Sequence, residues 1–346
     1  MTVRVGILGA TGAVGQRFIQ LLDDHPTFEL ATVTASESSA GKTYREAAKW
    51  RVDAPIPDDI AEMEVQATEP DSVADDVDLL FSSLPSGVAA EVEPAFLEEG
   101  FVVSSNSSND RLADDVPLTI PEINPGHLDL IEVQRDERCW DGALVKNPNC
   151  STITMVPTLA AIDQFGIEEI NVSTLQAVSG AGYSGVTSME IIDNAIPHIG
   201  GEENKMETES RKLLGDFDGA EVHHHEADVA ASCNRIPTID GHLENVFAKF
   251  AEDPSPAEVR TAMREFEGVD LPSAPDQLIK VYGEAEPERP QPRLDRTYAD
   301  GMGICAGGVQ STSDGVKYNC LSHNTIRGAA GASLLNGELL VEEGYV

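Results

Sequence analysis

Two segments of the chain combine residue types that can carry out covalent chemistry on a carbonyl group. In the first, KNPNCSTI, Cys150 follows a turn and opens a predicted helix. Free N–H groups at a helix N-terminus lower the pKa of a thiol there, and the thiolate is the reactive form. Cys150 is therefore a candidate nucleophile. The alternative is a buried structural cysteine, which is the commoner fate of a lone cysteine.

The second segment, SCNRIPTIDGH, contains a histidine and an arginine close to a predicted turn. His242 follows Gly241 after a predicted strand and could act as a general base. Arg235 could hold a carboxylate through two parallel hydrogen bonds. Each residue taken alone could equally be an ordinary surface residue.

A glycine-rich turn near the N-terminus has the pattern of a nucleotide-binding loop. Gly9, Gly12 and Gly15 lie between a strand rich in Val and Ile and a predicted helix that ends before Pro26. Glycines allow a tight turn, and the free N–H groups of the following helix can bind a pyrophosphate. The spacing is G-x-x-G-x-x-G rather than G-x-G-x-x-G, and a turn without a ligand is the alternative. The flanking strand and helix favour nucleotide binding.

The segment after the second predicted strand should distinguish NAD from NADP. Glu37 favours the free ribose of NAD, whereas Ser36, Ser39 and Lys42 favour the extra phosphate of NADP. These residues leave the choice open.

The predicted elements fall into two groups. The strand, helix and strand of residues 2–35, with further strands near 80 and 103, predict a doubly wound parallel sheet that binds ligands at its carboxyl edge. From about residue 151, longer strands, some with alternating polarity, predict an α+β catalytic and dimerisation domain with a mixed sheet. The small-residue-rich segment after 323 is expected to form a helix on the first domain. We expect a dinucleotide-binding domain of residues 1–149 and about 322–346, and a second domain of residues 150–321.

Eight segments, in order over almost the whole chain, carry a resemblance to a known family. They are GILGATGAVGQRF, SAGKTY, DVPLTIPEIN, NPNCSTI, QAVSGAGYSGV, SCNRIPTIDGH, RPQPRLDR and HNTIRGAAGASLLN. The chain resembles the aspartate-semialdehyde dehydrogenase family, in the branch found in archaea and fungi. The resemblance implies reduction of aspartyl-4-phosphate by NADPH through a cysteine thioester, in the biosynthesis of lysine, threonine, methionine and isoleucine.

The resemblance also implies a role for individual residues. Cys150 matches the nucleophile, His242 the acid/base and Gln176 the residue that orients the substrate. The implied substrate contacts are Arg235 for the α-carboxylate, Glu202 for the ammonium, Arg111 and Lys205 for the phosphate, and Asn149. The expected NADP contacts are Gly9, Thr11, Gly12, Ala13, Val14, Ser36, Ser39, Ser83, Ser179, Gly180 and Asn324.

Two departures and three alternatives accompany this resemblance. Ser38 stands where the branch often has Arg, and Asp110 where it often has an aromatic residue. Malonyl-CoA reductase would need neither a phosphate site nor an ammonium partner. N-acetyl-glutamyl-phosphate reductase usually has NPGC rather than NPNC. A non-catalytic nucleotide sensor would leave the cysteine segment without a purpose.

Composition bounds the remaining possibilities. The 23 basic and 60 acidic residues give a net charge of −37, which argues against binding nucleic acid. No apolar stretch approaches the length of a membrane span, and the opening residues read as a strand rather than a leader. Five scattered cysteines fit a reducing cytoplasm.

The run of residues 223–225, three histidines, cannot direct all its rings to one site in a strand, so no metal is expected. The resemblance implies a homodimer or homotetramer formed through the second domain.

The spread of acidic residues predicts a dependence on salt. Surface carboxylates repel one another, and the screening length falls from ~10 Å at 0.1 M to ~3 Å at 1 M salt. We therefore expect a higher melting temperature and higher activity at about 2 M KCl than at about 0.1 M. A melting temperature that does not change with salt, together with best activity in dilute buffer, would contradict adaptation to a high-salt cytoplasm.

Overall fold

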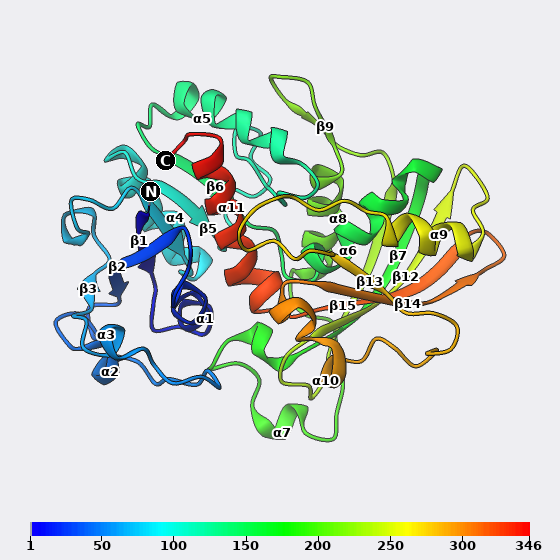
Figure 1. The fold of residues 1–346 in the computed structure, drawn as a ribbon, viewed down its shortest axis with the longest axis horizontal. Helices are drawn as coiled ribbons and strands as arrows, with labels where there is room; N and C mark the ends of the chain where they lie inside the picture. The colour runs from blue at the N-terminus through cyan, green and yellow to red at the C-terminus, as the bar shows by residue number, and fades with distance from the viewer. Residues whose placement is uncertain (1) are drawn as a thin grey trace.

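The first sheet of the computed structural model, which describes residues 2–346, consists of six parallel strands in the order β3-β2-β1-β4-β5-β6 (Figure 1). The strands are β1 (Val3–Leu8), β2 (Phe28–Ala35), β3 (Gln66–Ala67), β4 (Leu79–Ser82), β5 (Val102–Ser105) and β6 (Ala143–Lys146). The strand order reverses between β1 and β4, and sheets of this kind bind ligands at the carboxyl ends of the strands beside such a reversal.

The turn between β1 and the helix α1 (Ala13–Leu22) requires glycine. Gly9 has a φ of +84°, and a Cβ on Gly15 would lie 2.5 Å from the Gly9 carbonyl oxygen. Helix α1 can therefore begin close to the end of β1. Phe18 of α1 is fully buried and stacks on Phe81 of β4, with ring centroids 5.2 Å apart. The other helices of this part are α2 (Tyr44–Ala47), α3 (Asp58–Ala61), α4 (Ser86–Glu98) and α5 (Leu130–Arg138).

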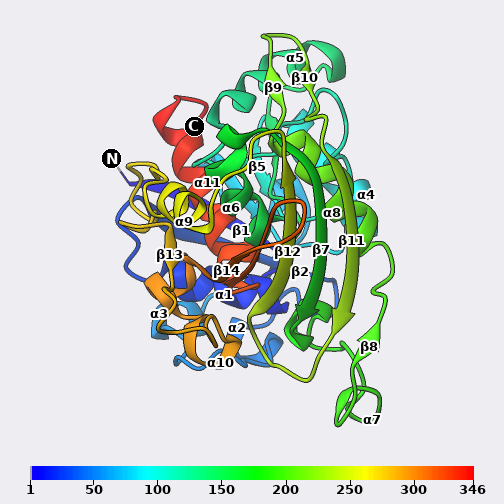
Figure 2. The ribbon, with the colours of Figure 1, turned by 90° about the vertical axis from the view of Figure 1, so that its right-hand side faces the viewer.

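The second sheet is mixed, with seven strands in the order β13-β14-β15-β12-β7-β11-β8. Its strands are β7 (Ile167–Gln176), β8 (Ile196–Pro197), β11 (Asp228–Arg235), β12 (His242–Phe250), β13 (Ile279–Val281), β14 (Ile304–Ser311) and β15 (Val316–Ser322). Helices α6 (Thr152–Ile162), α8 (Glu202–Leu213) and α9 (Pro256–Arg264) pack on this sheet. Figure 2 shows β12, β7 and β11 in front of α6 and α8. On the uncovered face, Phe247 is 47% exposed.

Four smaller elements complete the second part. They are α7 (Ser188–Ile191), β9 (Asp216–Phe217), β10 (Val222–His223) and α10 (Pro292–Asp295). The sequence predicted the fold class, a parallel doubly wound sheet with a second mixed α+β sheet, and this prediction is confirmed. In the described residues 2–346, no helix is both long and apolar enough to cross a membrane.

The C-terminal helix returns to the first sheet. A π-helical turn (Ile326–Ala330) leads into α11 (Gly331–Glu342), which is drawn in red beside β5 and β6 in Figure 1. Leu334 and Leu335 join the core of the first sheet, and Gly337 lies against the ring of Phe81. On this arrangement we propose the domain boundaries 1–149 with about 322–346, and 150–321.

A fully buried ion pair anchors the start of this C-terminal segment. Arg327 donates two hydrogen bonds to the carboxylate of Glu122, at 2.6 and 3.0 Å, and both side chains have 0% exposure. Removing one partner of such a pair leaves the other charge buried without compensation.

We predict that Arg327→Met lowers the free energy of unfolding by about 3–5 kcal/mol, because the buried carboxylate of Glu122 loses the guanidinium that it pairs with. Urea unfolding at constant salt measures this change. The matched control is Arg45→Met, which breaks a pair with Glu62 whose side chains are 55% and 72% exposed. It should change the unfolding free energy by at most about 1 kcal/mol. Equal effects of the two substitutions would contradict the anchoring role of Arg327.

Candidate active site

A crevice of about 400 Å³ lies at the carboxyl edge of the first sheet, where residues from both sheets meet. Its lining includes Cys150, Gln176, Glu202, Lys205, Arg111 and Asn149, together with Ala13, Val14, Ser83, Ser179, Gly180 and Asn324. Most of the residues that the sequence assigned to substrate and cofactor therefore face one space.

Cys150, the candidate nucleophile, lies just before helix α6, in a turn that the side chain of Asn149 holds. The side-chain oxygen of Asn149 accepts hydrogen bonds from the backbone N–H of Ser151 at 3.0 Å and of Thr152 at 3.3 Å, and so caps the start of the helix. Cys150 Sγ lies 3.3 Å from Nε2 of His242, the first residue of β12. Residues 92 positions apart are thus within hydrogen-bond distance of each other.

The backbone around His242 selects one form of its ring. Nδ1 accepts a hydrogen bond from the N–H of Ala177 at 3.1 Å, so the neutral ring carries its proton on Nε2, which faces the sulfur. Burial, reinforced by the positive charge of Arg235, lowers the pKa of His242 to about 3. The ring is therefore a neutral hydrogen-bond donor toward Cys150 at physiological pH.

The expected lowering of the Cys150 pKa is wrong. Burial, with the negative charge of Glu202 as the next cause, raises the pKa of this thiol to about 12, although Arg235 and Arg111 act in the opposite direction. Desolvation of a thiolate outweighs the helix N-terminus here. With this pKa, Cys150 is a protonated thiol at neutral pH.

Arg235 and Gln176 lie side by side at the ends of two paired strands. Arg235 ends β11, Gln176 ends β7, and the two residues are partners in the parallel register. Arg235 Nη1 donates to the Ala177 carbonyl at 2.7 Å. Gln176 Nε2 is buried and has no hydrogen-bond partner among the described residues. A Cβ on Gly180 would lie 2.9 Å from Arg235 Nη1 and 3.3 Å from the His242 ring, so glycine keeps this space open.

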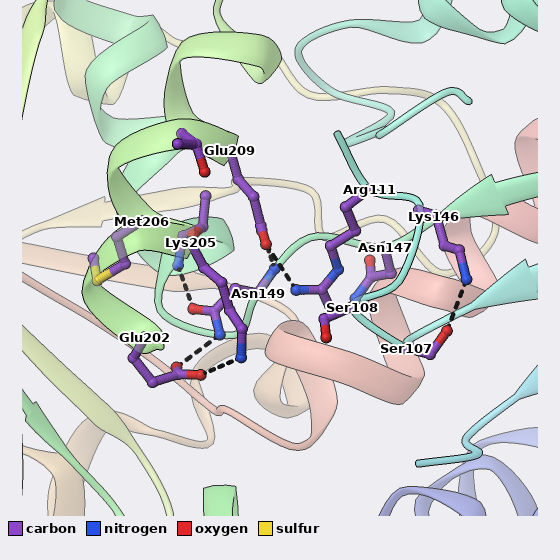
Figure 3. Close-up of polar contacts among 12 residues, drawn as sticks. Ser107, Ser108, Arg111, Lys146, Asn147, Asn149, Glu202, Lys205, Met206 and Glu209 are labelled. Carbon is purple, nitrogen blue, oxygen red and sulfur yellow. Dashed lines mark hydrogen bonds and ion pairs between the residues drawn. The ribbon is translucent and has the colours of Figure 1, made fainter. Parts of the chain in front are cut away.

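Helix α8 supplies the opposite wall of the site (Figure 3). Lys205 donates to Glu202 at 2.8 Å, and the side-chain amide of Asn149 donates to the same carboxylate at 2.7 Å. Glu202 and Lys205, three residues apart on this helix, are therefore in contact. Arg111 approaches from the loop after β5, donates to Glu209 at 2.9 Å, and has its Nε buried without a partner among residues 2–346.

The predicted cofactor residues divide into two groups. Ala13, Val14, Ser83, Ser179, Gly180 and Asn324 line the crevice, whereas Gly9, Thr11, Gly12, Ser36 and Ser39 lie outside it, in the turns after β1 and β2. The Ser83 hydroxyl contacts the carbonyls of Leu8 and Gly9 at 3.0 Å each. The glycine geometry at the start of α1 fits a bound pyrophosphate.

The run of three histidines lies apart from the crevice. His223 contacts Asp218 at 2.9 Å, and its ligand atoms lie with those of Asp218 and Glu221 within 4.8 Å of one another on the exposed surface. His225 contacts Asp163 instead. The histidine run therefore does not converge, and the absence of a metal stays a prediction.

Comparison with known proteins decides the family. Residues 4–131 match the family described as semialdehyde dehydrogenase, NAD binding domain, and residues 159–327 match semialdehyde dehydrogenase, dimerisation domain. The chain is 49% identical over 344 residues to an aspartate-semialdehyde dehydrogenase of Archaeoglobus fulgidus, covering 99% of each chain. The chain belongs to the aspartate-semialdehyde dehydrogenase family.

Relatives on both sides of the predicted branch agree with this assignment. The aspartate-semialdehyde dehydrogenase of Schizosaccharomyces pombe is 45% identical over 354 residues, covering 99% of both chains. A crystal structure of the Candida albicans aspartate-semialdehyde dehydrogenase with NADP has a TM-score of 0.91 at 39% identity, covering 100% of each chain. A Vibrio cholerae structure complexed with ASA has a TM-score of 0.79 at 26% identity and covers 99% of both chains. The archaeal and fungal branch predicted from the sequence is confirmed.

Sequence reasoning missed two residues of the site. Glu209 binds Arg111, and its position on α8 one turn beyond Lys205 was a readable signal. Gly328 lies against the nucleophile, since a Cβ there would be 2.8 Å from the Cβ of Cys150. A close approach between residues so distant in sequence leaves no local signal.

The raised thiol pKa predicts how Cys150 reacts with iodoacetamide. Because only the thiolate reacts, the rate should rise about tenfold per pH unit from about pH 6 to 9. The exposed Cys139 is the internal control for the reactivity of the reagent. Peptide mass spectrometry separates the two sites. A Cys150 rate that is constant above about pH 7 would show instead that the helix N-terminus dominates.

Proposed function

We propose that this chain reduces aspartyl-4-phosphate to aspartate semialdehyde through an acyl thioester on Cys150, with release of phosphate. The observation that carries the proposal is the 3.3 Å contact between Nε2 of the buried His242 and Sγ of Cys150, which lines a crevice with two cations and a carboxylate. The names of relatives from both archaea and fungi support the same activity.

The chemistry assigned to Cys150 is one acyl transfer followed by reduction of the resulting thioester. Its thiolate attacks the acyl carbon, the carbon–oxygen bond to phosphate breaks, and a thioester forms while phosphate leaves. NADPH, when bound, supplies the hydride that reduces the acyl group. The carbon–sulfur bond of the reduced adduct then breaks, which releases the aldehyde and restores the thiolate. The proton lost by the Cys150 thiol leaves with the phosphate, and the proton consumed overall returns the thiolate to the thiol.

Two charged residues near Cys150 fit the carboxylate and the ammonium that an amino-acid substrate carries on its α-carbon. Arg235 would hold the α-carboxylate, and Glu202 would accept the ammonium. The negative charge of Glu202 is also the largest cause, after burial, of the raised pKa of Cys150. Pairing Glu202 with the substrate ammonium would reduce this effect, so substrate binding would favour ionisation of the thiol at the time it is needed.

His242 and Gln176 would stabilise negative charge near the acyl carbon. The N–H at Nε2 of His242 faces the sulfur, and the free amide N–H of Gln176 has no protein partner among the described residues. Donors held in place by the backbone suit an oxyanion that forms only during the reaction. This refines the acid/base role of His242 implied by the resemblance into that of a hydrogen-bond donor.

We propose NADP as the cofactor. Ser36 and Ser38 lie with hydroxyls 3.0 Å apart, and Lys42 donates to the Ser38 carbonyl at 2.6 Å. These hydroxyls and the cation follow β2, where an NADP phosphate binds in folds of this kind. The Candida albicans relative contains NADP. The residues proposed to hold it are Gly9, Thr11, Gly12, Ala13, Val14, Ser36, Ser39, Ser83, Ser179, Gly180 and Asn324.

We further propose self-association, as a homodimer or a homotetramer, through the uncovered face of the second sheet. That region matches a dimerisation domain, and Phe247 is half exposed on this face. The net charge of −37 supports a cytoplasm of high salt as the place where the chain works.

A spectrophotometric assay with aspartate semialdehyde, phosphate and NADP tests the proposal. Wild type should form NADPH, and Cys150→Ala should abolish turnover, because no thioester can form. The matched control is Cys139→Ala, which removes an exposed thiol and should keep wild-type activity. NADP-induced stabilisation against heat should persist in both variants. A Cys150→Ala enzyme with near wild-type turnover would exclude the thioester.

A further inference from the structure

One buried carboxylate connects the phosphate-binding arginine to the nucleophile. Glu209 of α8 is 1% exposed. Its Oε1 accepts from Arg111 Nη1 at 2.9 Å, and its Oε2 accepts from the backbone N–H of Asn149 at 2.7 Å (Figure 3). Asn149 immediately precedes Cys150, so a single side chain spans the two groups that would act on the two ends of an acyl phosphate bond.

The substrate makes the separation of these two groups matter. In an acyl phosphate, one bridging oxygen joins the phosphorus to the carbon that the sulfur attacks. The phosphate site and the sulfur must therefore stand at a set distance, and a displacement of about 1 Å can cost 10²-fold in rate. Building on the proposed function, we propose that Glu209 is a positioning residue that holds Arg111 in register with Cys150 for phosphate transfer.

The fold does not depend on Glu209 alone to join these parts. Lys212, one turn further along α8, donates to the carbonyls of Arg111, Ala113 and Val116 at 2.7–3.1 Å. The loop that carries Arg111 is thus already attached to α8 through its backbone. In addition, the carboxylate of Glu209 orients the guanidinium of Arg111.

Loss of Glu209 should affect Arg111 more than Cys150. The nucleophile turn keeps other hydrogen bonds, including three made by the side chain of Asn149. Among residues 2–346, the guanidinium of Arg111 keeps a single hydrogen bond, to the carbonyl of Asn106 at 2.7 Å. Glu209→Gln preserves the length of the side chain but offers one acceptor for two donors. The phosphate-dependent half of the reaction should therefore be impaired, and thioester formation should be retained.

The experiment follows thioester formation and the phosphate-dependent step separately, in the direction from aspartate semialdehyde to aspartyl phosphate. Without phosphate, the enzyme with NADP should give a burst of NADPH as the thioester forms. We expect Glu209→Gln to keep the burst amplitude and to raise the KM for inorganic phosphate roughly 10–100-fold. The rise in melting temperature caused by inorganic phosphate should also be smaller in this variant.

The control is Glu207→Gln, the same change on the same helix. Glu207 accepts from the backbone N–H of Ala231 at 3.1 Å and touches neither Arg111 nor Asn149. It should leave the burst and the phosphate KM unchanged. Glu209→Asp, which keeps both acceptors on a shorter side chain, should also raise the phosphate KM, and it tests the proposal if Glu209→Gln fails to fold.

Two results would overturn the positioning role. One is a wild-type phosphate KM and phosphate-induced stabilisation in the folded Glu209 variant. The other is an equal loss of the burst and of phosphate-dependent turnover, which a general structural defect would produce. Absence of a burst in wild type would contradict the proposed thioester chemistry instead, while the phosphate-induced stabilisation would still test Glu209.

Discussion

The contact between Cys150 Sγ and His242 Nε2 is the constraint on which the arrangement of both sheets depends. It requires the start of α6 to meet the start of β12. Strand β12 pairs with β7 on one side and β15 on the other, with His242 opposite Ser322. The same sheet end therefore delivers Gln176 from β7 and Asn324 just beyond β15. The side chain of Asn324 connects the turn before β12 with the segment after β7. It accepts a hydrogen bond from the Gly241 N–H and donates one to the Ser179 hydroxyl, both at 2.8 Å.

Charge in the site is organised before any substrate arrives. Arg111 is paired with Glu209 and Lys205 with Glu202, and nearby Lys146 donates to Glu93 at 2.9 Å with both side chains buried. A buried ion pair adds little net stability, because removing both charges from water costs about as much as their attraction returns. Such pairs are instead expected at sites where charged side chains must stay in fixed positions while charge develops on the substrate. The paired side chains then need not reorganise during the reaction.

The sequence predicted features that depend on neighbouring residues better than contacts between residues far apart in the chain. The glycine turn, helix α1 and the parallel sheet follow from local patterns, and the site residues followed from segments shared with a family. The state of Cys150 did not, because burial by distant segments outweighs the helix terminus beside it. The Arg327–Glu122 pair joins residues 205 positions apart and has no local signature. Likewise, the position of Glu209 one turn beyond Lys205 pointed toward the site, but its partner Arg111 lies 98 positions away and could not be read from the sequence.

The measurement that tests the account most directly is the intact mass of the enzyme after mixing with aspartate semialdehyde and NADP in the absence of phosphate. The account predicts a mass increase equal to one aspartyl group per chain, located on Cys150 by peptide mapping and removed on addition of phosphate. Turnover without any covalent adduct, or an adduct on a residue other than Cys150, would contradict it.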